Sequence, residues 1–298
     1  MLIYLNGKLV PKEEAKVSVY DHGILYGDGV FEGIRAYEGN IFRLKEHIDR
    51  LYESAKTIML ELPLTREQLM QATADTVAAN GLRDVYIRLV VTRGVGDLGI
   101  DPAKCAKPTL FIIADKIALF PPEFYEKGIP LATASTRRIP MQCVDPRIKS
   151  LNYLNNILAK IEGKRAGVLE SVMLNELGRV AECTADNIFI IKNHTLITPS
   201  VTEGALPGIT RGAVLELASE IDLDVQETML GLHDLYNADE CFLTGTGAEI
   251  MPVIAVDGRV VGDGLPGKTT HRLLARFREL RVTDGWKVVY DTETTSAK

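Results

Sequence analysis

The chain has 298 residues, of which 46% are hydrophobic and 25% are charged, as in ordinary globular proteins. This length is enough for one large domain or for two modest domains with separate cores. The net charge of −6 argues against a nucleic-acid binder, which would need a basic face. The apolar runs are too short for a signal peptide or a membrane span, and the four cysteines are scattered without metal-ligand spacing. The sequence therefore predicts a cytoplasmic protein without a metal site.

The first 120 residues combine short strand pairs with helices. Strands are predicted, from β-branched runs bounded by Gly or Asn turns, at 2–5, 8–10, 31–37, 41–43, 85–92 and 109–114. One helix is predicted from Leu44, where apolar residues recur at helical spacing. A second helix is predicted after Thr65, which forms a capping-box pattern with Gln68, and it should end near Asn80. Because strand pairs and helices are segregated, this half is predicted to be α+β, not a Rossmann fold.

Two prolines in Phe120–Glu123 predict a linker, because proline interrupts both helices and strand ladders. We therefore expect a small N-terminal domain at 1–120, a linker at 121–127 and a large domain at 128–298. In the large domain, a helix is predicted at 151–166 and strands at 171–174, 180–182, 187–191 and 195–198. Many short antiparallel strands favour a barrel-like domain. A second helix should open at Thr210.

An ordered set of segments carries the chemistry. Its parts are Asp145–Asn156 with Lys149, Glu182–Phe189, Leu196–Thr198 and Leu206–Arg211. Taken alone, Lys149 would be interpreted as a solvated surface charge. The whole series, including its gaps, resembles the signature of the class IV aminotransferases, which are fold-type IV enzymes dependent on pyridoxal phosphate (PLP). Tyr26–Arg35, Phe42–Leu51 and Thr244–Ile250 extend the resemblance over almost the whole chain, and the branched-chain amino acid aminotransferases are the most similar subfamily.

The resemblance implies a two-domain fold, with a small sandwich-like α/β domain and a larger barrel-like domain, and a set of residues that hold PLP. Lys149 is expected to bind the cofactor aldehyde as a Schiff base and then to shuttle a proton. Glu182 is expected to keep the pyridine nitrogen protonated, and Tyr153 to bond the phenolic oxygen. Ile209 and Thr210 begin a helix, which makes a natural anion site with a hydroxyl available as cap and ligand. Arg50 and Thr246 complete the expected phosphate site.

The same resemblance implies a substrate pocket and a substrate class. The matching positions are Tyr26, Phe31, Gly33, Tyr86, Arg88, Gly247 and Ala248. We expect transamination of L-leucine, L-isoleucine and L-valine with 2-oxoglutarate, which gives branched-chain 2-oxo acids and L-glutamate and serves branched-chain amino acid biosynthesis. We also expect a homodimer or higher homo-oligomer, because family members complete each pocket with a loop from the neighbouring copy. Partners other than small amino acids and 2-oxo acids are not expected, neither nucleic acid nor membrane.

Rival functions of the same fold are D-amino-acid aminotransferase, R-selective amine aminotransferase and aminodeoxychorismate lyase. The D-specific enzymes bind the substrate carboxylate with basic residues in the loop that corresponds to 95–102, and that loop contains no Arg or His here. This absence, with Tyr86 and Arg88, favours L-branched-chain substrates.

A rival of a different class is suggested by Gly262–Thr269, which satisfies the Walker A pattern of P-loop NTPases. The strand before it is predicted to be the return arm of a hairpin turned at Asp257-Gly258. A P-loop needs a central parallel strand instead, and too few residues follow for a nucleotide-binding sheet. We therefore expect Lys268 to be an ordinary lysine in the first turn of a helix.

Overall fold

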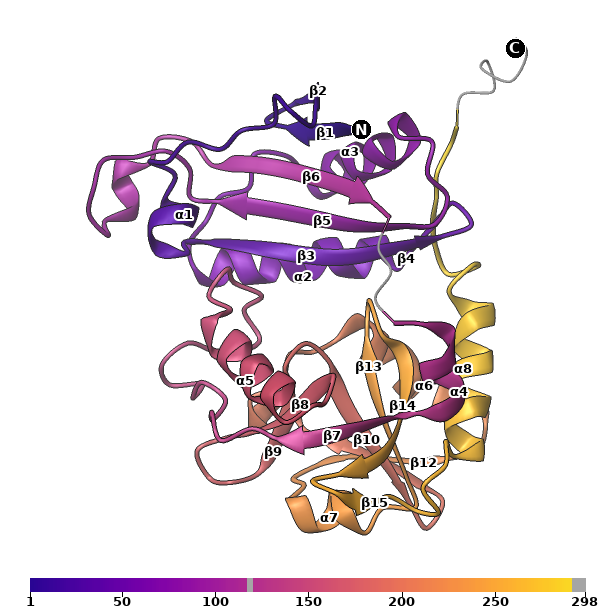
Figure 1. Ribbon diagram of the computed structural model, residues 1–298. Coiled ribbons are helices and arrows are strands. Elements are labelled where there is room, and N and C mark those ends of the chain that lie inside the picture. Colours follow the sequence, from indigo (N-terminus) through magenta and orange to yellow (C-terminus); the bar gives the residue numbers. More distant parts are fainter. Residues whose placement is uncertain (117–119, 291–298) are drawn as a thin grey trace. The chain divides into compact units, whose positions relative to one another are not determined.

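The computed structural model describes residues 1–116 and 120–290, which form two compact units (Figure 1). Unit 1 consists of Met1–Ile117, Ile148–Asn152 and Leu280–Lys298, and unit 2 of Ala118–Arg147 and Tyr153–Glu279. The sequence predicted one passage between domains, at 121–127, whereas unit 2 begins at Ala118, so that residues 121–127 lie within it. The chain also passes between the units at 147–148, 152–153 and 279–280, because two short segments far along the chain pair with strands of unit 1.

Within the described residues, unit 1 is a seven-stranded antiparallel sheet with helices. The strands are β1 (Leu2–Leu5), β2 (Lys8–Pro11), β3 (Gly29–Tyr37), β4 (Asn40–Phe42), β5 (Val85–Thr92), β6 (Thr109–Asp115) and β16 (Gly285–Lys287). Their order is β16-β4-β3-β5-β6-β1-β2. The helices are α1 (His22–Tyr26), α2 (Leu44–Thr57), α3 (Arg66–Ala79) and the short 3-10 helix Pro102–Lys104. The predicted strands and both predicted long helices of this half are confirmed.

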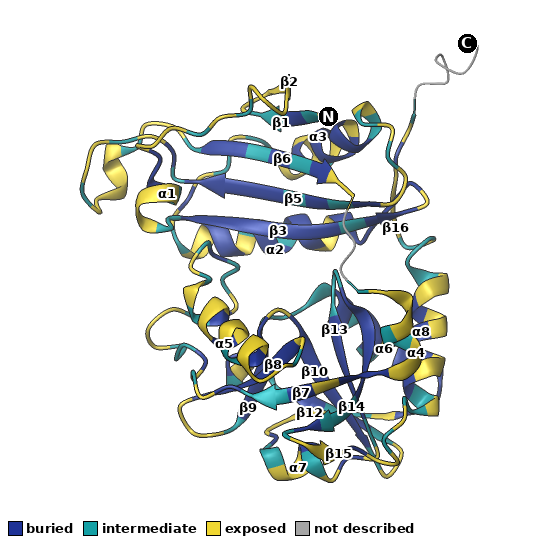
Figure 2. Cartoon of the chain, viewed as in Figure 1, coloured by how far each residue is buried: buried dark blue, intermediate teal, exposed yellow. Residues whose placement is uncertain are grey.

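The core of unit 1 lies between the sheet and the helices α2 and α3, as the buried faces in Figure 2 show. Alternate residues of β3 and β5 enter this core. Among them are Val30, Ile34, Ile87 and Leu89, which are fully buried. The intervening residues therefore lie on the other face of the sheet. The predicted capping box at Thr65 and Gln68 is present and fixes the start of α3.

Unit 2 is a curled, mixed sheet whose nine described strands surround a second core. They are β7 (Ile129–Thr133), β8 (Glu170–Leu174), β9 (Val180–Cys183), β10 (Asn187–Lys192), β11 (Thr195–Pro199), β12 (Asp224–Thr228), β13 (Glu240–Gly245), β14 (Glu249–Val256) and β15 (Arg259–Val260). The order is β12-β11-β10-β13-β14-β7-β8-β9, with β15 on β14. The barrel-like prediction is confirmed, but β11–β12, β14–β7 and β7–β8 are parallel pairs.

The helices of unit 2 correct three sequence predictions. They are α4 (Pro122–Lys127), α5 (Leu154–Arg165), α6 (Ile209–Glu220), α7 (Leu232–Tyr236), α8 (Lys268–Leu280, whose last residue falls in unit 1) and the 3-10 helix Val201–Glu203. The predicted linker contains α4, because proline is tolerated in the first turn of a helix. Helix α5 begins three residues later than predicted, because the amide of Leu151 donates to the carbonyl of Gly29 on β3. The N-cap of α6 is Gly208, so Thr210 lies in the first turn and is not the cap.

Candidate active site

Lys149 belongs to a short segment that runs beside the start of β3 in unit 1. The Phe31 amide donates to the Lys149 carbonyl at 3.0 Å, and the Lys149 amide donates to Ser54 Oγ on α2 at 3.1 Å. Val30 and Ser150 form an isolated antiparallel bridge. The Lys149 Nζ lies 4.6 Å from the centroid of the Phe31 ring. The backbone is thus fixed on both sides, and the amine is held above an aromatic face.

Behind this segment lies a buried charged cluster of Glu32, His47 and Arg50. Arg50 Nε and Nη2 donate to the two oxygens of Glu32 at 2.8 and 2.7 Å, and His47 Nδ1 lies 2.7 Å from Glu32 Oε2. Burial alone would raise the pKa of Glu32, but the charges of Arg50 and His47 lower it to about 2. Burial lowers the pKa of His47, against the pull of Glu32. Arg50, the expected phosphate ligand, is therefore fixed by a permanent anion.

The outer face of β3 and β5 carries four of the expected substrate residues. Phe31 and Gly33 lie on β3, and Tyr86 and Arg88 on β5, with Gly33 directly opposite Arg88. The Arg88 guanidinium lies 4.5 Å from the Phe31 ring centroid and 5.4 Å from that of Tyr86. A Cβ on Gly33 would lie 2.2 Å from the Tyr86 hydroxyl oxygen, so only glycine leaves room for that hydroxyl. These four residues form one group with Lys149.

Tyr26, the remaining aromatic residue expected at the substrate pocket, is the last residue of α1. Its hydroxyl accepts a hydrogen bond from the Gly99 amide at 2.8 Å, and its ring meets His22 edge-on at 5.0 Å. The contact ties Tyr26 to the loop 95–101. It gives Tyr26 a defined structural role in unit 1.

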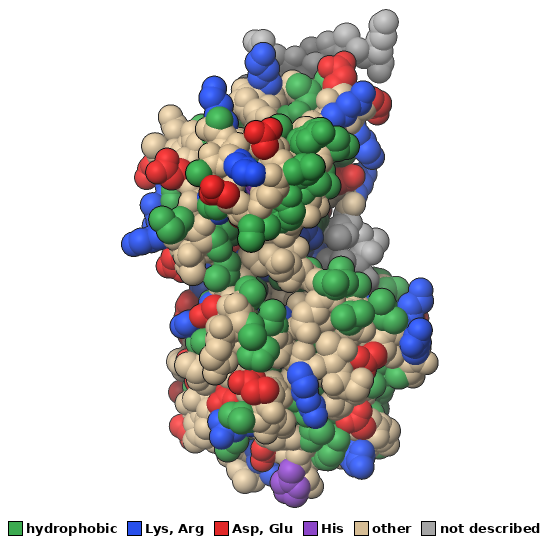
Figure 3. Space-filling model, turned by 90° about the vertical axis from the view of Figure 1, so that its left-hand side faces the viewer, with side chains coloured by type: hydrophobic (Ala, Val, Ile, Leu, Met, Phe, Trp, Pro, Cys, Tyr) green, Lys and Arg blue, Asp and Glu red, His purple; other side chains and the backbone are tan. Residues whose placement is uncertain are grey.

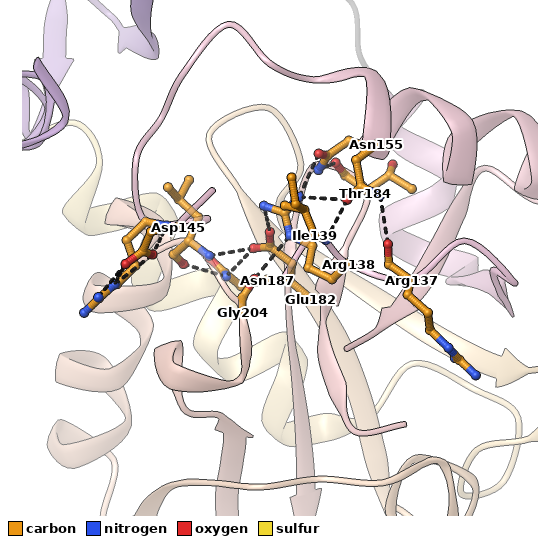
Figure 4. Close-up of polar contacts among 12 residues, drawn as sticks. Arg137, Arg138, Ile139, Asp145, Asn155, Glu182, Thr184, Asn187 and Gly204 are labelled. Carbon is orange, nitrogen blue, oxygen red and sulfur yellow. Dashed lines mark hydrogen bonds and ion pairs between the residues drawn. The ribbon is translucent and has the colours of Figure 1, made fainter. Parts of the chain in front are cut away.

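In unit 2, Glu182 on β9 is held by three donors (Figure 4). Arg138 Nη2 lies 2.9 Å from Glu182 Oε1, and both side chains are buried. Glu182 Oε2 accepts from the Leu206 amide at 2.9 Å and from Asn187 Nδ2 at 3.3 Å. Arg138 is itself fixed by Asn156 Oδ1 at 2.8 Å. A buried carboxylate with this many donors keeps one orientation.

The residues that bond to Glu182 also contact the segment that leads into α6. Asn187 Nδ2 donates to the Leu206 carbonyl at 2.9 Å, and its Oδ1 would lie 2.1 Å from a Cβ on Gly208. The segment before α6 is therefore packed directly against Asn187 and Glu182. No side-chain cap hydrogen bond closes the N-terminus of α6 in the described part of the chain, and Thr210 is buried in its first turn. The amides at Ile209 and Thr210 form a potential anion site beside the carboxylate.

The turn between β13 and β14 contains Thr246, Gly247 and Ala248. Tyr125 donates its hydroxyl hydrogen to the Ala248 carbonyl at 3.1 Å, which anchors the turn. A Cβ on Gly245 would lie 2.0 Å from Asp186 Oδ1, so glycine permits this close approach. Tyr153 lies half-buried directly before α5, in the same unit.

The Walker A segment has a different environment. The Thr269 and Thr270 amides donate to the Glu240 carboxylate at 3.0 and 2.7 Å, and the Thr270 hydroxyl donates to it at 2.7 Å. A Cβ on Gly267 would lie 1.9 Å from Glu240 Cδ. The strand before the segment, β15, pairs antiparallel with β14, as predicted. The protein's own carboxylate fills the place where an NTPase would hold phosphate, and Lys268 is the first residue of α8.

The residues present fit a cofactor with an aldehyde, a basic ring nitrogen and a phosphate. Lys149 supplies an amine, Glu182 a fixed carboxylate and α6 a helix N-terminus without a side-chain cap. Gly208 and Gly245 keep the backbone close to Asn187 and Asp186, where side chains would not fit. No cluster of three potential metal-ligating side chains was found in residues 1–116 and 120–290.

A family model described as amino-transferase class IV matches residues 29–256. The chain belongs to the class IV aminotransferases. These transferases use PLP, and PLP is therefore the cofactor of this chain.

Branched-chain enzymes are prominent among the relatives of this class IV aminotransferase. A provisionally named branched-chain-amino-acid aminotransferase of Methanocaldococcus jannaschii is 55% identical over 291 residues, which cover 98% of this chain and 100% of that protein. The structure of the Escherichia coli branched-chain amino acid aminotransferase has a TM-score of 0.92 at 36% identity, covering 98% and 97%. The structure of the T.th. branched-chain amino acid aminotransferase with pyridoxamine 5'-phosphate has a TM-score of 0.91 at 39% sequence identity, and the match covers 94% of each chain. A second structure of the T.th. enzyme, with N-(5'-phosphopyridoxyl)-L-glutamate, has a TM-score of 0.89 at 38% sequence identity. This match also covers 94% of each chain.

Several residues of the site were not singled out by the sequence. Glu32 and His47 lie within matched segments, but only the structure shows that the Glu32 carboxylate binds both His47 and Arg50. Arg138 lies 44 residues before its partner Glu182 and has no local pattern that would mark it. The described residues contain no helix that is long and apolar enough to cross a membrane.

Proposed function

We propose that the chain catalyses PLP-dependent transamination of L-leucine, L-isoleucine and L-valine with 2-oxoglutarate. The observation that carries this proposal is the connected arrangement in unit 2, where Glu182 is bonded to the backbone that leads into α6. In such an arrangement, Glu182 would bind the ring nitrogen of the cofactor and the N-terminus of α6 would bind its phosphate, with the distance between the two groups fixed by the fold. The branched-chain enzymes among the relatives support the substrate class.

Each cofactor contact is assigned to a residue of this chain. Lys149 would hold the aldehyde carbon, and its released amine would then move the proton at the substrate Cα. Glu182 would keep the ring nitrogen protonated, and Tyr153 would bond the phenolic oxygen. Arg50, Ile209, Thr210 and Thr246 would bind the phosphate. When bound, PLP supplies the electron sink that makes the substrate Cα–H acidic.

For the substrate, we assign the carboxylate to Tyr86 and Arg88 and to the turn with Gly247 and Ala248. Tyr26, Phe31 and Gly33 would form the apolar side of the pocket. An apolar pocket separates close homologues by only about 1–3 kcal/mol per methylene, so all three branched-chain substrates should react. The T.th. complex with a phosphopyridoxyl-glutamate adduct supports 2-oxoglutarate as the acceptor.

We further propose that the enzyme is a cytoplasmic homodimer. A group of exposed apolar side chains in unit 1, here named the loop surface, supports self-association. It consists of Tyr20, Ile24, Leu25, Val95, Leu98 and Ile100. Its two segments are joined because the Gly96 amide donates to the Tyr20 carbonyl at 3.2 Å. Exposed apolar groups of this size mark protein contacts, and the scattered cysteines fit a reducing compartment.

Absorbance spectra of the PLP-loaded protein test the proposal. L-leucine should shift the visible band of the bound cofactor to shorter wavelength, and 2-oxoglutarate should then restore it. L-isoleucine and L-valine should act similarly. Faster conversion of D-alanine than of L-leucine would contradict the assignment and favour a D-specific enzyme.

Arg88→Leu resolves which carboxylate Arg88 serves. If Arg88 orients the α-carboxylate, single-turnover rates of both half-reactions fall. If it binds the γ-carboxylate, mainly the 2-oxoglutarate half-reaction slows.

A further inference from the structure

One side of helix α2 is polar although it is buried. His47, Arg50 and Ser54 follow one another at spacings of three and four residues, which places them on the same side of the helix. Charged side chains of both signs are spread over the molecular face in Figure 3, whereas these three side chains are buried. Burying a polar group costs free energy unless the group is hydrogen-bonded, so each of the three is expected to have a partner. We name these three residues the polar face of α2.

Two members of the polar face of α2 share the Glu32 carboxylate. Arg50 donates to both Glu32 oxygens, and His47 Nδ1 lies 2.7 Å from one of them. Glu32 alternates along β3 with the core residues Val30 and Ile34, so its side chain lies on the side of the sheet that α2 covers. Arg50 is therefore held in place from β3 as well as from its own helix.

The third member, Ser54, binds the segment that contains Lys149. The Ser54 hydroxyl oxygen accepts a hydrogen bond at 3.1 Å from the Lys149 amide, which is 95 residues further along the chain. Serine is a weaker helix former than alanine, and the next residue of α2, Ala55, is buried as well. Alanine at position 54 would suit the helix better, but it would remove this acceptor from the Lys149 amide. The serine is therefore explained by its contact with Lys149 and not by the needs of α2.

Lys149 is the central residue of a three-residue turn, because the Ser150 amide donates to the Ile148 carbonyl at 2.8 Å. Two backbone bonds tie this turn to β3, and they involve the Lys149 carbonyl and the Leu151 amide. Both bonds lie on the C-terminal side of the Lys149 Cα. The bond to Ser54 lies on the N-terminal side of that Cα, at the Lys149 amide. The atom from which the amine-bearing side chain leaves is thus held by β3 after it and by α2 before it.

We propose that Ser54 is a positioning residue for Lys149, which holds the lysine at a fixed place relative to Arg50 on the same helix. The inference rests on the proposed function, in which Lys149 bonds the aldehyde of the cofactor and Arg50 binds its phosphate. Ser54 and Arg50 are about one helical turn apart, so α2 is a rigid spacer between the two contacts. Reacting groups that are misplaced by about 1 Å react up to about a hundredfold more slowly, so a single backbone bond at Lys149 has a measurable effect.

Two forms of the cofactor separate the positioning of the lysine from the stability of the site. Pyridoxal 5'-phosphate carries an aldehyde. The Lys149 amine forms a C=N bond with the aldehyde carbon, and the aldehyde oxygen leaves as water with both amine protons. Pyridoxamine 5'-phosphate has the same ring and phosphate but no aldehyde, so it cannot form this bond. A change that affects only the lysine therefore alters the affinity for the first form alone, whereas a general loss of structure alters both.

Equilibrium dialysis of the full-length apoprotein against each form measures the two dissociation constants. Ser54→Ala should raise the dissociation constant for pyridoxal phosphate about tenfold, the effect of one hydrogen bond. The constant for pyridoxamine phosphate should stay within about twofold, which also shows that the variant is folded. Ser54→Thr keeps the hydroxyl and should retain the wild-type ratio of the two constants.

Thr76 provides the matched control. It is buried on α3 in the same unit, and its hydroxyl donates to the Ala72 carbonyl at 2.6 Å. Thr76→Val removes a buried, hydrogen-bonded hydroxyl without changing the segment of Lys149, so the ratio of the two constants should stay the same. An unchanged ratio in Ser54→Ala, or a rise of both constants by the same factor, would overturn the inference.

Lys149→Ala separates this inference from the proposed function, because the measurement requires no substrate. If Lys149 bonds the aldehyde, this variant should lose most of its preference for pyridoxal phosphate over pyridoxamine phosphate. A wild-type preference in Lys149→Ala would contradict the proposed function and the inference with it. Loss of the preference in Lys149→Ala, together with a wild-type ratio in Ser54→Ala, would refute only the positioning role of Ser54.

Discussion

Helices α6 and α8 of unit 2 both follow a glycine and carry a threonine in the first turn, yet their N-termini differ. The first-turn amides of α8 donate to Glu240, so its positive end is already neutralised within the chain. No side chain caps α6 in the described residues, and the backbone before it is bonded to Glu182. The α8 segment has the better-known phosphate motif, but its first-turn amides already have an internal acceptor, whereas no described side chain caps the first turn of α6.

The difference shows that a glycine-rich pattern before a helix does not identify an anion site. The site exists only if the amides of the first turn have no internal acceptor. At α8, a carboxylate 29 residues earlier in the chain is that acceptor. The following predictions test the contrast, beginning with the largest expected effect.

Glu182→Gln tests whether the carboxylate beside α6 belongs to the catalytic site. The amide keeps the shape but removes the charge that would hold a proton on the ring nitrogen. We expect cofactor to bind and turnover with L-leucine to fall at least about a hundredfold, as for a positioned acid–base group. Unchanged turnover would mean that another residue serves the ring nitrogen.

Glu240→Ala tests the structural role of the carboxylate at α8. The Thr269 and Thr270 amides and the Thr270 hydroxyl would lose their acceptor, which should cost about 2 kcal/mol of unfolding free energy. Urea unfolding of the apoprotein measures this loss. The affinity for PLP should stay the same. A variant as stable as the wild type would show that the cap contributes nothing.

Thr210→Val and Thr269→Val form a matched pair at the two helix starts. Loss of the Thr210 hydroxyl should weaken PLP binding about tenfold, the effect of one hydrogen bond to a charged group. Thr269→Val should leave PLP affinity unchanged. Equilibrium dialysis of both variants measures the difference, and equal losses would remove the distinction between α6 and α8.

Lys268→Ala should have the smallest effect. Because Lys268 only begins α8, steady-state turnover with L-leucine should stay within about twofold of the wild type. A P-loop NTPase would lose its function with this substitution. Severe loss of turnover would therefore reopen the Walker A interpretation.

Much of the fold follows from local sequence signals. The capping box of Thr65 and Gln68 and the hairpin turns at Asn6-Gly7 and Asp257-Gly258 act over a few residues, and the structure contains all of them. The apolar periodicity of α2 likewise identified its buried face. These elements were predictable because neighbouring residues determine them.

The contacts that organise the site act over long sequence separations. The start of α5 was misplaced because Leu151 bonds to Gly29, over one hundred residues earlier. The bond from Arg138 to Glu182 and the occupation of the α8 terminus by Glu240 have the same character. The family resemblance named Lys149 and Glu182, but it could not show which neighbours fix them.

Identification of the modified lysine tests the central claim most directly. Borohydride treatment of the PLP-loaded protein fixes the bond between cofactor and lysine, and peptide mass spectrometry then locates the added phosphopyridoxyl mass. We expect this mass on the peptide that contains Lys149 and none on the peptide that contains Lys268. Modification of Lys268, or of any lysine other than Lys149, would contradict the account.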